Sequence, residues 1–416
     1  MDAESVRAEV RAWLEANWSP ELSLVEWRNK LADSGWGCPT WPVEWYGRGL
    51  SPSLAEVANE EFEKIGAVGT PGGGGMGLAA PTILEHGSDD LKRRLLRRIV
   101  TGEDTWCQLF SEPGSGSDLA GLTTRAELSA DGDEYVVNGQ KLWTTSAHHA
   151  KYGMLLARTN WDVPKHRGIT YFALEMHQPG VVVKPLKQMN GHASFNEVFL
   201  NDARVPAANA IGDVGNGWTV ALATLAHERR SFDVLQRAAR SARGQGRAYD
   251  EQRAETTQIM APYTWYPQRA GRADLIVERA QATGKARDPV VRQEIAKLLA
   301  LARATEWTAK RARAARMAGR PPGPEGSLGK LYASEIARAC SRVHTLITGT
   351  DALLSGADGP LEGVIAEILV SVPAVSIAGG TDEIQRNIVS ERVLGLPKDP
   401  DIDTKKPFRD VPRNKR

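Results

Sequence analysis

The most constraining feature of this chain is a loop that is too rich in glycine, serine and proline for regular structure. It spans Gln108 to Asp118 and reads Q-L-F-S-E-P-G-S-G-S-D. Gly114 and Gly116 allow backbone N–H groups to approach a ligand closely, and the serines of the loop supply hydroxyl donors. We therefore interpret the loop as a cradle for an anionic ligand or for a ligand with many hydrogen-bond acceptors.

A strand-like segment follows this loop in the chain and reads K-L-W-T-T-S from Lys141 to Ser146. Trp143 offers a flat apolar face, whereas Thr144 and Thr145 offer short hydrogen-bond donors. A cofactor ring held between the loop and this strand is the simplest interpretation. The alternative is a surface loop beside an ordinary strand.

The two segments resemble the flavin-binding signature of acyl-CoA dehydrogenases, which reads T-E-P-G-A-G-S-D and then W-I-T. Here the corresponding letters are S-E-P-G-S-G-S-D and W-T-T. The resemblance extends over nearly the whole chain through G-W-T-V-A-L-A-T-L-A-H-E-R at 217–229 and G-G-T-D-E-I-Q-R-N-I-V-S-E-R at 379–392. It implies an FAD cofactor and the oxidation of an acyl-CoA to a trans-2-enoyl-CoA.

The hydrophobic pattern divides the chain into helical and strand-like segments. At 416 residues the chain is long enough for several domains. We predict an α+β multidomain fold of the acyl-CoA dehydrogenase type, with a helical N-terminal domain, a central antiparallel β-domain and a C-terminal domain like a four-helix bundle. The predicted domains span 1–105, 106–215 and 216–395, and a tail spans 396–416 that is solvated or packed on a neighbouring chain.

Local signals within these domains are turns and long periodic runs. Asp131-Gly132 predicts a turn, and Asn138-Gly139 predicts a hairpin before the Trp143 strand. Helical periodicity is clear at 220–235, 290–317 and 328–347.

The resemblance assigns FAD contacts to the loop, to the W-T-T segment and to the C-terminal region. Ser111 would bond the pyrimidine edge, Thr145 would lie beside N5, and Ser117 would lie near the pyrophosphate or the CoA. The full set of implied FAD contacts is Gln108, Phe110, Ser111, Gly116, Ser117, Trp143, Thr144, Thr145, Thr381 and Glu383.

The catalytic base departs from the common family pattern. Many members carry it as the Glu of Y-E-G-T, but this chain reads A-G-G-T from Ala378 to Thr381. Gly379 keeps the backbone N–H that would bind the thioester oxygen. Branched-chain and long-chain members carry the Glu in L-x-x-E-R, and this chain has L-A-H-E-R from Leu225 to Arg229.

The resemblance therefore implies Glu228 as the base and Arg229 as a CoA or pocket contact. A partly desolvated Glu suits the removal of a weakly acidic α-proton. The alternative for Glu228 is a surface carboxylate in an i,i+4 pair. Asp382 and Glu383 are the fallback carboxylates, although they suit capping or cofactor contacts better.

Two family motifs are missing or eroded, which bears on assembly. The R-x-x-F-G whose Arg reaches a neighbouring subunit's FAD is absent from 242–271, and the Q-x-x-G-G-x-G-Y segment reads I-T-G-T-D-A-L-L-S-G at 347–356. The resemblance implies a homo-oligomer or an α2β2 hetero-oligomer with a related chain, of which this chain is the half with the base. The rival is a non-catalytic subunit that completes a partner's FAD site. A weaker third possibility is a flavin oxidase or monooxygenase.

The implied substrate is a bulky, branched or ring-bearing acyl-CoA from fatty acid or steroid side-chain catabolism. The implied electron acceptor is an electron-transfer flavoprotein or a similar protein. The net charge of +1 gives no basic field for a nucleic-acid partner. The N-terminus is acidic and lacks the apolar run of a signal, and no stretch approaches 18 apolar residues, so we predict a cytoplasmic bacterial protein without membrane insertion.

The remaining motifs carry no function in this interpretation. Cys38, Cys107 and Cys340 are scattered without a C-x-x-C, so neither a disulfide framework nor a zinc site is predicted. No histidine pair has the spacing of a metal site, and we predict no metal. The run P-G-G-G-G-M-G at 71–77 formally contains G-x-G-x-x-G. It follows a helical pattern instead of a strand, so we reject a dinucleotide site and expect a flexible connection between helices.

Overall fold

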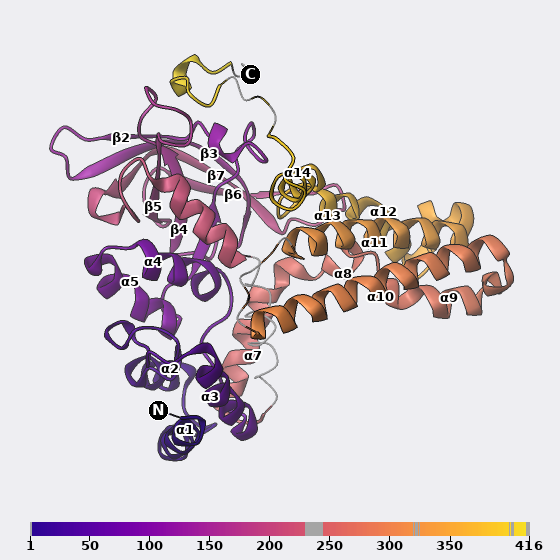
Figure 1. Ribbon diagram of the computed structural model, residues 1–416, viewed down its shortest axis with the longest axis horizontal. Helices are drawn as coiled ribbons and strands as arrows, with labels where there is room; N and C mark the ends of the chain where they lie inside the picture. The colour runs from indigo at the N-terminus through magenta and orange to yellow at the C-terminus, as the bar shows by residue number, and fades with distance from the viewer. Residues whose placement is uncertain are drawn as a thin grey trace. The chain divides into compact units, whose positions relative to one another are not determined.

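The protein is described by a computed structural model that covers residues 2–228, 244–318, 320, 323, 325–398, 400 and 403–412. Its contacts divide the chain into two compact units (Figure 1). The first contains Met1–Leu186, Ala193–Pro262 and Ile402–Arg416, and the second contains Lys187–His192 and Tyr263–Asp401. Residues 216–262, which we assigned to the C-terminal domain, thus belong to the first unit by contacts, and the four predicted domain spans stay predictions.

The N-terminal helices of the first unit begin at side-chain caps, except α4 (Ala80–His86), which continues from the preceding turn. Capping oxygens come from Asp2, Ser23, Ser51 and Ser88, which accept backbone N–H groups of the first turn. Apolar positions at helical spacing then face a core that includes Trp27. The helices are α1 (Ala3–Asn17), α2 (Leu24–Ser34), α3 (Pro52–Ile65), α4 (Ala80–His86) and α5 (Asp89–Thr101).

The glycine-rich run at 71–77 leads into a π-helical turn, η2 (Gly75–Ala79), which continues as α4. A side chain at Gly74 would lie 2.8 Å from the carbonyl oxygen of Trp106, so close packing requires the glycine there. Because the run follows α3 and leads into a helix, it lacks the strand that a dinucleotide site needs. Part of the connection that we expected to be flexible, from Gly75 onward, therefore forms a regular π-helical turn.

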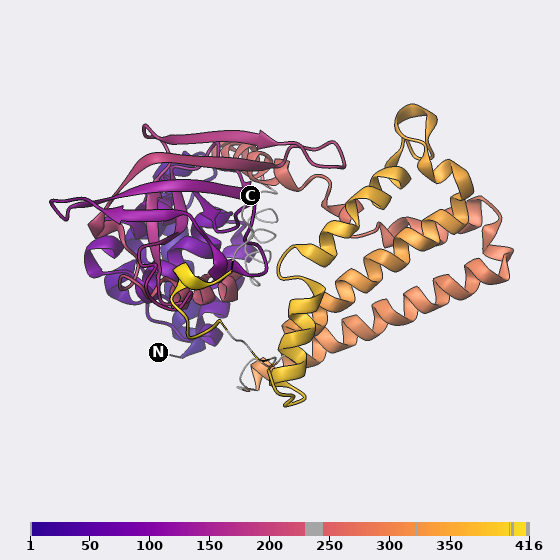
Figure 2. The ribbon, with the colours of Figure 1, turned by 90° about the horizontal axis from the view of Figure 1, so that it is seen from above.

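The sheet of the first unit has the strand order β1-β4-β2-β3-β7-β6, and β5 also pairs with β4. Figure 2 shows several of its strands side by side. The sheet is mostly antiparallel, as predicted, but β1 pairs in parallel with β4 and β2 meets β4 at one parallel bridge. The strands are β1 (Trp106–Leu109), β2 (Arg125–Leu128), β3 (Glu134–Thr145), β4 (Tyr152–Arg158), β5 (Ile169–Glu175), β6 (Val181–Leu186) and β7 (Phe195–Pro206).

Alternate residues of the central strands bury both faces of the sheet. On β4, Met154 and Leu156 join the core that α4 and α5 share, whereas Leu155 and Ala157 join the core on the opposite face. The sheet is therefore fixed to the N-terminal helices through one face.

The prediction of a hairpin at Asn138-Gly139 is wrong. Both residues lie inside β3, at an irregularity in its pairing with β7. Asn138 exchanges hydrogen bonds of 2.9 Å with Asp202, and a side chain at Gly139 would collide with Thr124 at 2.4 Å. The Asn-Gly pair thus marks a β-bulge and a close approach of β3 to Thr124. The predicted turn at Asp131-Gly132 is confirmed, because it joins β2 to β3.

Helix α7 (Arg247–Met260) lies within the region predicted to be helical, but no periodic pattern singled it out. Its polar pattern carries little periodicity, and contacts from distant residues hold it. Arg28 forms a 2.5 Å ion pair with Glu255, and the hydroxyl of Tyr249 donates to the carbonyl of Gly66. Contacts with residues distant in the sequence, instead of a local pattern, thus stabilise this helix.

The second unit contains the two long helices that periodicity predicted, α10 (Pro289–Met317) and α11 (Glu325–Thr348), which pack together. With the helical N-terminal region and the central sheet, these helices confirm the predicted fold class. The shorter helices are α8 (Tyr266–Arg269), α9 (Ile276–Ala282), α12 (Val364–Ser371), α13 (Pro373–Ile377) and α14 (Asp382–Arg392).

One described segment, Val364–Arg392, is long and apolar enough to cross a membrane by length and composition alone. Its most apolar window has a mean hydropathy of 1.7 and is 22% buried. The segment comprises α12, α13 and α14, which Pro373 and the Gly379-Gly380 pair separate. A single span of this kind is weak support for membrane insertion.

Candidate active site

The loop at 108–118 is anchored by a buried ion pair between Glu112 and Lys141. The Lys141 ammonium lies 2.8 Å from Glu112 Oε1 and also donates to the carbonyl of Phe110. The other carboxylate oxygen accepts the backbone N–H and the hydroxyl of Thr123. Lys141 is 0% and Glu112 5% exposed. The pair therefore joins the loop to β3 from inside the protein.

The Glu112 carboxylate is ionised in this setting. Burial raises its pKa, but the Lys141 charge and hydrogen bonds from Lys141, Thr124 and Thr123 outweigh that effect and lower the pKa to about 2. An ionised, fully paired carboxylate fixes the loop backbone through charge-assisted hydrogen bonds. The two residues are structural supports of the site instead of reacting groups.

The exposed side of the loop is open. A side chain at Gly114 or Gly116 would meet nothing within 4 Å, and neither glycine has a positive φ. No contact or conformation in the described chain therefore requires glycine at these positions. Close approach of a ligand to the backbone is a requirement that glycine would meet. The residues present fit a cradle for a large cofactor.

A bulge presents Trp143 to solvent beside this loop. The pairing of β3 with β7 shifts between Lys141 and Thr144, and Trp143 adopts a φ of 61°. A bulky residue in the left-handed region is strained, and such strain occurs at ligand-binding positions. The indole is 54% exposed and stands edge-on to Phe195 at 5.7 Å. It offers a flat apolar face to a ligand.

Thr144 follows the bulge and is buried. Its carbonyl accepts a hydrogen bond of 2.9 Å from Asn196, but its hydroxyl oxygen has no hydrogen-bond partner. An unsatisfied buried hydroxyl is costly and points to a group that binds there. Thr145 and Ser146, which continue the segment, are half-buried. The segment therefore fits the same ligand as the loop.

Glu228 lies at the end of the described part of a helix that is visible over 217–228. The side-chain amide of Gln108 donates to Glu228 Oε2 at 3.3 Å. One turn earlier, the buried hydroxyl of Thr224 lies 2.9 Å from Thr82 on α4 and 3.1 Å from Tyr171 on β5. This hydroxyl cluster fixes the helix to the sheet and so places Glu228 at β1.

The other predicted site residues of the first unit differ in burial and in hydrogen bonding. The ring of Phe110 is buried, 5.8 Å from Tyr171, so only its backbone remains for a ligand. The Ser111 carbonyl accepts the N–H of Leu142, and Ser117 is exposed. Arg229 lies outside the described residues.

The predicted residues of the second unit surround the start of α14. Thr381 caps the helix by accepting the N–H of Ile384, and Glu383 is exposed with 76% of its side chain accessible. Gly379 has a φ of 68° and open space at its Cβ position. Capping is thus the visible role of Thr381.

Asp382 is a structural acceptor in the second unit. Its carboxylate accepts hydrogen bonds from Arg338, Ser334 and Lys330 at 2.7–3.1 Å. Burial raises its pKa, but these bonds bring the pKa well below its usual range. A carboxylate held ionised by three donors is a poor proton acceptor, which argues against the fallback base.

The sequence analysis missed the supports of the site. It named neither the Glu112–Lys141 pair nor the Thr82, Thr224 and Tyr171 hydroxyls. The lysine before L-W-T-T and the glutamate inside S-E-P-G were visible, but their pairing depends on how β3 lies against the loop.

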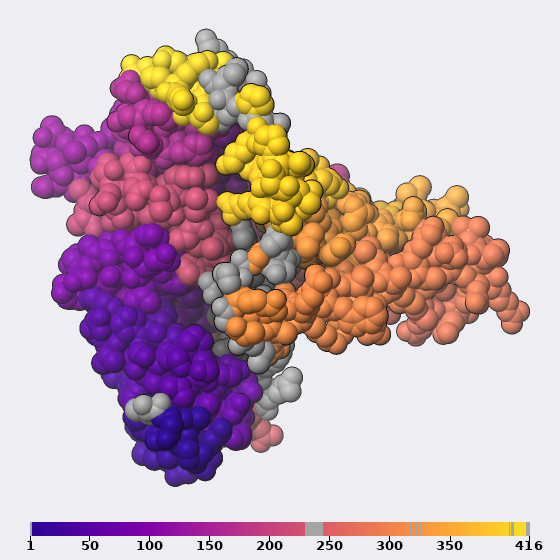
Figure 3. Space-filling model, viewed as in Figure 1, coloured from indigo at the N-terminus to yellow at the C-terminus, as the bar shows by residue number. Residues whose placement is uncertain are grey.

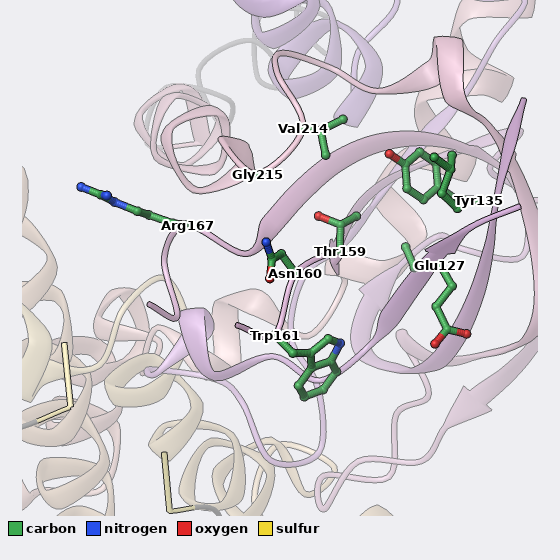
Figure 4. Close-up of a pocket in the computed structure, with 10 residues that line it drawn as sticks. Glu127, Tyr135, Thr159, Asn160, Trp161, Arg167, Val214 and Gly215 are labelled. Carbon is green, nitrogen blue, oxygen red and sulfur yellow. The ribbon is translucent and has the colours of Figure 1, made fainter. Parts of the chain in front are cut away.

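A cavity of about 530 Å³ opens elsewhere in the first unit (Figure 4). None of the predicted site residues lines it. Its lining residues are Ala126, Glu127, Leu128, Tyr135, Thr159, Asn160, Trp161, Arg167, Val214 and Gly215.

Comparison with known proteins gives a consistent result along the chain. Residues 2–103, 107–203 and 273–394 match the N-terminal, middle and C-terminal domains of acyl-CoA dehydrogenases. Acyl-CoA dehydrogenase IpdE1 of Mycobacterium tuberculosis is 33% identical over 96% of this chain and 99% of its own.

Two solved structures are similar over nearly the whole chain. The ChsE4-ChsE5 complex from Mycobacterium tuberculosis is 28% identical, with a TM-score of 0.60 over 95% of this chain and 98% of its own. The steroid ACAD Tcur3481-Tcur3483 is 25% identical, with a TM-score of 0.64 over 96% of this chain and 100% of its own.

Proposed function

Because the chain belongs to the acyl-CoA dehydrogenase family, we propose that it dehydrogenates an acyl-CoA between Cα and Cβ with Glu228 as the base. The family makes it a flavoprotein oxidoreductase that uses FAD. The base, the individual cofactor contacts and the substrate class are the parts that we infer.

The 3.3 Å contact between Gln108 and Glu228 is the observation that carries this proposal. It brings the candidate base to the strand from which the cofactor loop begins, although the two residues are far apart in the sequence. Glu228 is half-buried. A partly desolvated carboxylate suits the uptake of a weakly acidic proton.

Residues of the loop and of the bulged strand would hold the cofactor. The backbone at Gly116 and the hydroxyls of Ser111 and Ser117 suit its polar groups, and the indole of Trp143 suits a ring. The buried hydroxyl of Thr144 would gain a partner. When bound, FAD accepts the hydrogen that leaves Cβ as hydride.

Glu228 would remove the α-proton, and the electron pair of that C–H bond would become the Cα–Cβ double bond as the β-hydride leaves. The developing charge on the thioester oxygen needs hydrogen-bond donors. We assign the backbone N–H of Gly379 to that oxygen, and Arg229 to the CoA or pocket. Thr381 and Glu383 stay assigned to the cofactor.

Replacing Gly116 by valine tests the cofactor loop. We expect the variant to fold normally, because a Cβ there meets nothing within 4 Å, and to bind FAD about tenfold more weakly because the side chain fills the cradle. Fluorescence titration of the apoprotein with FAD measures the change. Gly69→Val is a matched control, since Gly69 is equally open and has no positive φ. Equal FAD affinity in both variants would contradict the assignment.

We propose a bulky substrate, such as a steroid or another ring-bearing acyl-CoA. The relative at a TM-score of 0.64 is a steroid ACAD. Anaerobic titration of the FAD-loaded protein with straight, branched and ring-bearing acyl-CoAs distinguishes these classes. Bleaching near about 450 nm, where oxidised flavins absorb, by ring-bearing thioesters would support the proposal. Bleaching by straight chains alone would contradict the substrate class.

Assembly with a related chain is favoured by the missing R-x-x-F-G motif, and one similar structure is a complex of two different chains. A homo-oligomer and a non-catalytic role in a partner's site are the competing possibilities. We expect the chain purified alone to retain less than one FAD per chain, measured by its visible spectrum and protein content. Full, stable occupancy in a homo-oligomer would rule out an obligate partner. The electron-transfer flavoprotein acceptor and the cytoplasmic location stay predictions.

A further inference from the structure

The C-terminal tail returns to the first unit and packs against the sheet domain of its own chain. We call residues 403–412 the C-terminal strap; in Figure 3 its yellow atoms lie on the sheet domain. The backbone N–H groups of Phe408 and Arg409 donate to the carbonyls of Val163 and Trp161 at 2.9 and 3.0 Å. Arg409 also forms an ion pair with Asp162. These contacts replace the expectation of a tail that is solvated or packed on a neighbouring chain.

Phe408 covers a buried cation at the end of β4. Its ring is 1% exposed, and the guanidinium carbon of Arg158 lies 3.4 Å from the ring centroid. Arg158 is fully buried and donates to the carbonyls of Leu122, Ala120 and Lys165 at 3.1, 2.6 and 3.0 Å. A guanidinium kept from water by an aromatic face forms stronger hydrogen bonds.

Two of the three carbonyls that Arg158 binds, those of Ala120 and Leu122, belong to the turn that directly follows the cofactor loop. The 3-10 helix η3 (Leu119–Gly121) begins directly after Asp118. Lys165, whose carbonyl Arg158 binds, forms a 3.0 Å ion pair with Asp118. The Ser115 hydroxyl donates to the carbonyl of Asp118. Phe408, Arg158, the turn and Ser115, which lies between the two open glycines in the chain, thus form one continuous series of contacts.

We propose that the C-terminal strap positions the cofactor loop, with Phe408 and Arg158 as positioning residues for FAD. The inference rests on the proposed role of the loop at 108–118. The Glu112–Lys141 pair anchors the start of that loop, and the strap anchors its end. Loosening the end adds an ordering cost to FAD binding.

The test compares Phe408→Ala with the parent chain in FAD titration and in hydrogen exchange of the FAD-loaded protein, with any partner chain that it requires. We expect the Kd for FAD to rise about tenfold and exchange to rise at 115–122. Phe408→Tyr retains the aromatic face, so its Kd for FAD and its exchange at 115–122 should equal those of the parent chain. Lys405→Ala, an exposed change within the strap, leaves both unchanged.

The two proposals fail in different ways. If Gly116→Val weakens FAD binding and Phe408→Ala does not, the strap has no positioning role and this inference is overturned. If Gly116→Val has no effect either, the loop is not the FAD cradle. If Phe408→Ala does not fold, Phe408→Leu keeps the apolar cover without the aromatic face and should raise the Kd by a smaller factor. A fall in Tm with an unchanged Kd in that variant also overturns the inference.

Discussion

Replacing Glu228 by glutamine is expected to lower kcat by about 10²–10⁴-fold while FAD stays bound, because a positioned base contributes a factor of this size. Glutamine has nearly the same shape and keeps a polar contact with Gln108, which now lies 3.3 Å from the carboxylate. Pre-steady-state reduction of the flavin by the best acyl-CoA measures the chemical step directly. KM should change little, because the variant keeps the volume of the side chain.

Two companion variants make this result specific. Glu228→Asp should recover part of the rate, because it restores a carboxylate at a greater distance from the substrate. Glu56→Gln, which alters an exposed carboxylate on α3, should leave kcat unchanged. Normal turnover of the assembled Glu228→Gln enzyme would instead favour the non-catalytic subunit.

The second large effect concerns stability. Lys141→Met should lower the free energy of unfolding by about 3–5 kcal/mol at neutral pH, because it leaves the buried Glu112 carboxylate without its charge partner. The loop attached to Glu112 would loosen, and FAD would be retained less well. Urea denaturation at pH 7 measures the loss, with Lys64→Met, whose side chain is 56% exposed, as the control.

The difference in unfolding free energy between wild type and Lys141→Met should depend on pH, and this dependence follows from the Glu112 pKa. The folded-state pKa of about 2 lies below the ordinary value of 4.5, so the pair stabilises the fold above about pH 4.5. That stabilisation is lost as pH falls toward 2, and the difference between wild type and Lys141→Met should narrow there. The double variant Glu112→Gln/Lys141→Met should be more stable than Lys141→Met at neutral pH. A difference that is independent of pH would contradict the ionised pair.

The sequence by itself determined the features that depend on near neighbours. Helical periodicity gave α10 and α11, and the glycines at 114 and 116 marked a loop that could not be regular. The order of loop, W-T-T and L-A-H-E-R sufficed to indicate the family, because these motifs keep most of the family's letters and follow one another in the same order. Each of these signals is carried by residues close together in the chain.

Only the tertiary structure decided the contacts between distant residues. Asn138-Gly139 has the letters of a hairpin, yet Thr124 and Asp202 make it a bulge inside β3. The Glu112–Lys141 pair, the contact of Gln108 with Glu228 and the cover of Phe408 on Arg158 each join segments that no local pattern connects. Their burial and charge depend on the packing of the whole unit, and such interactions have no periodicity or turn preference that a sequence could display.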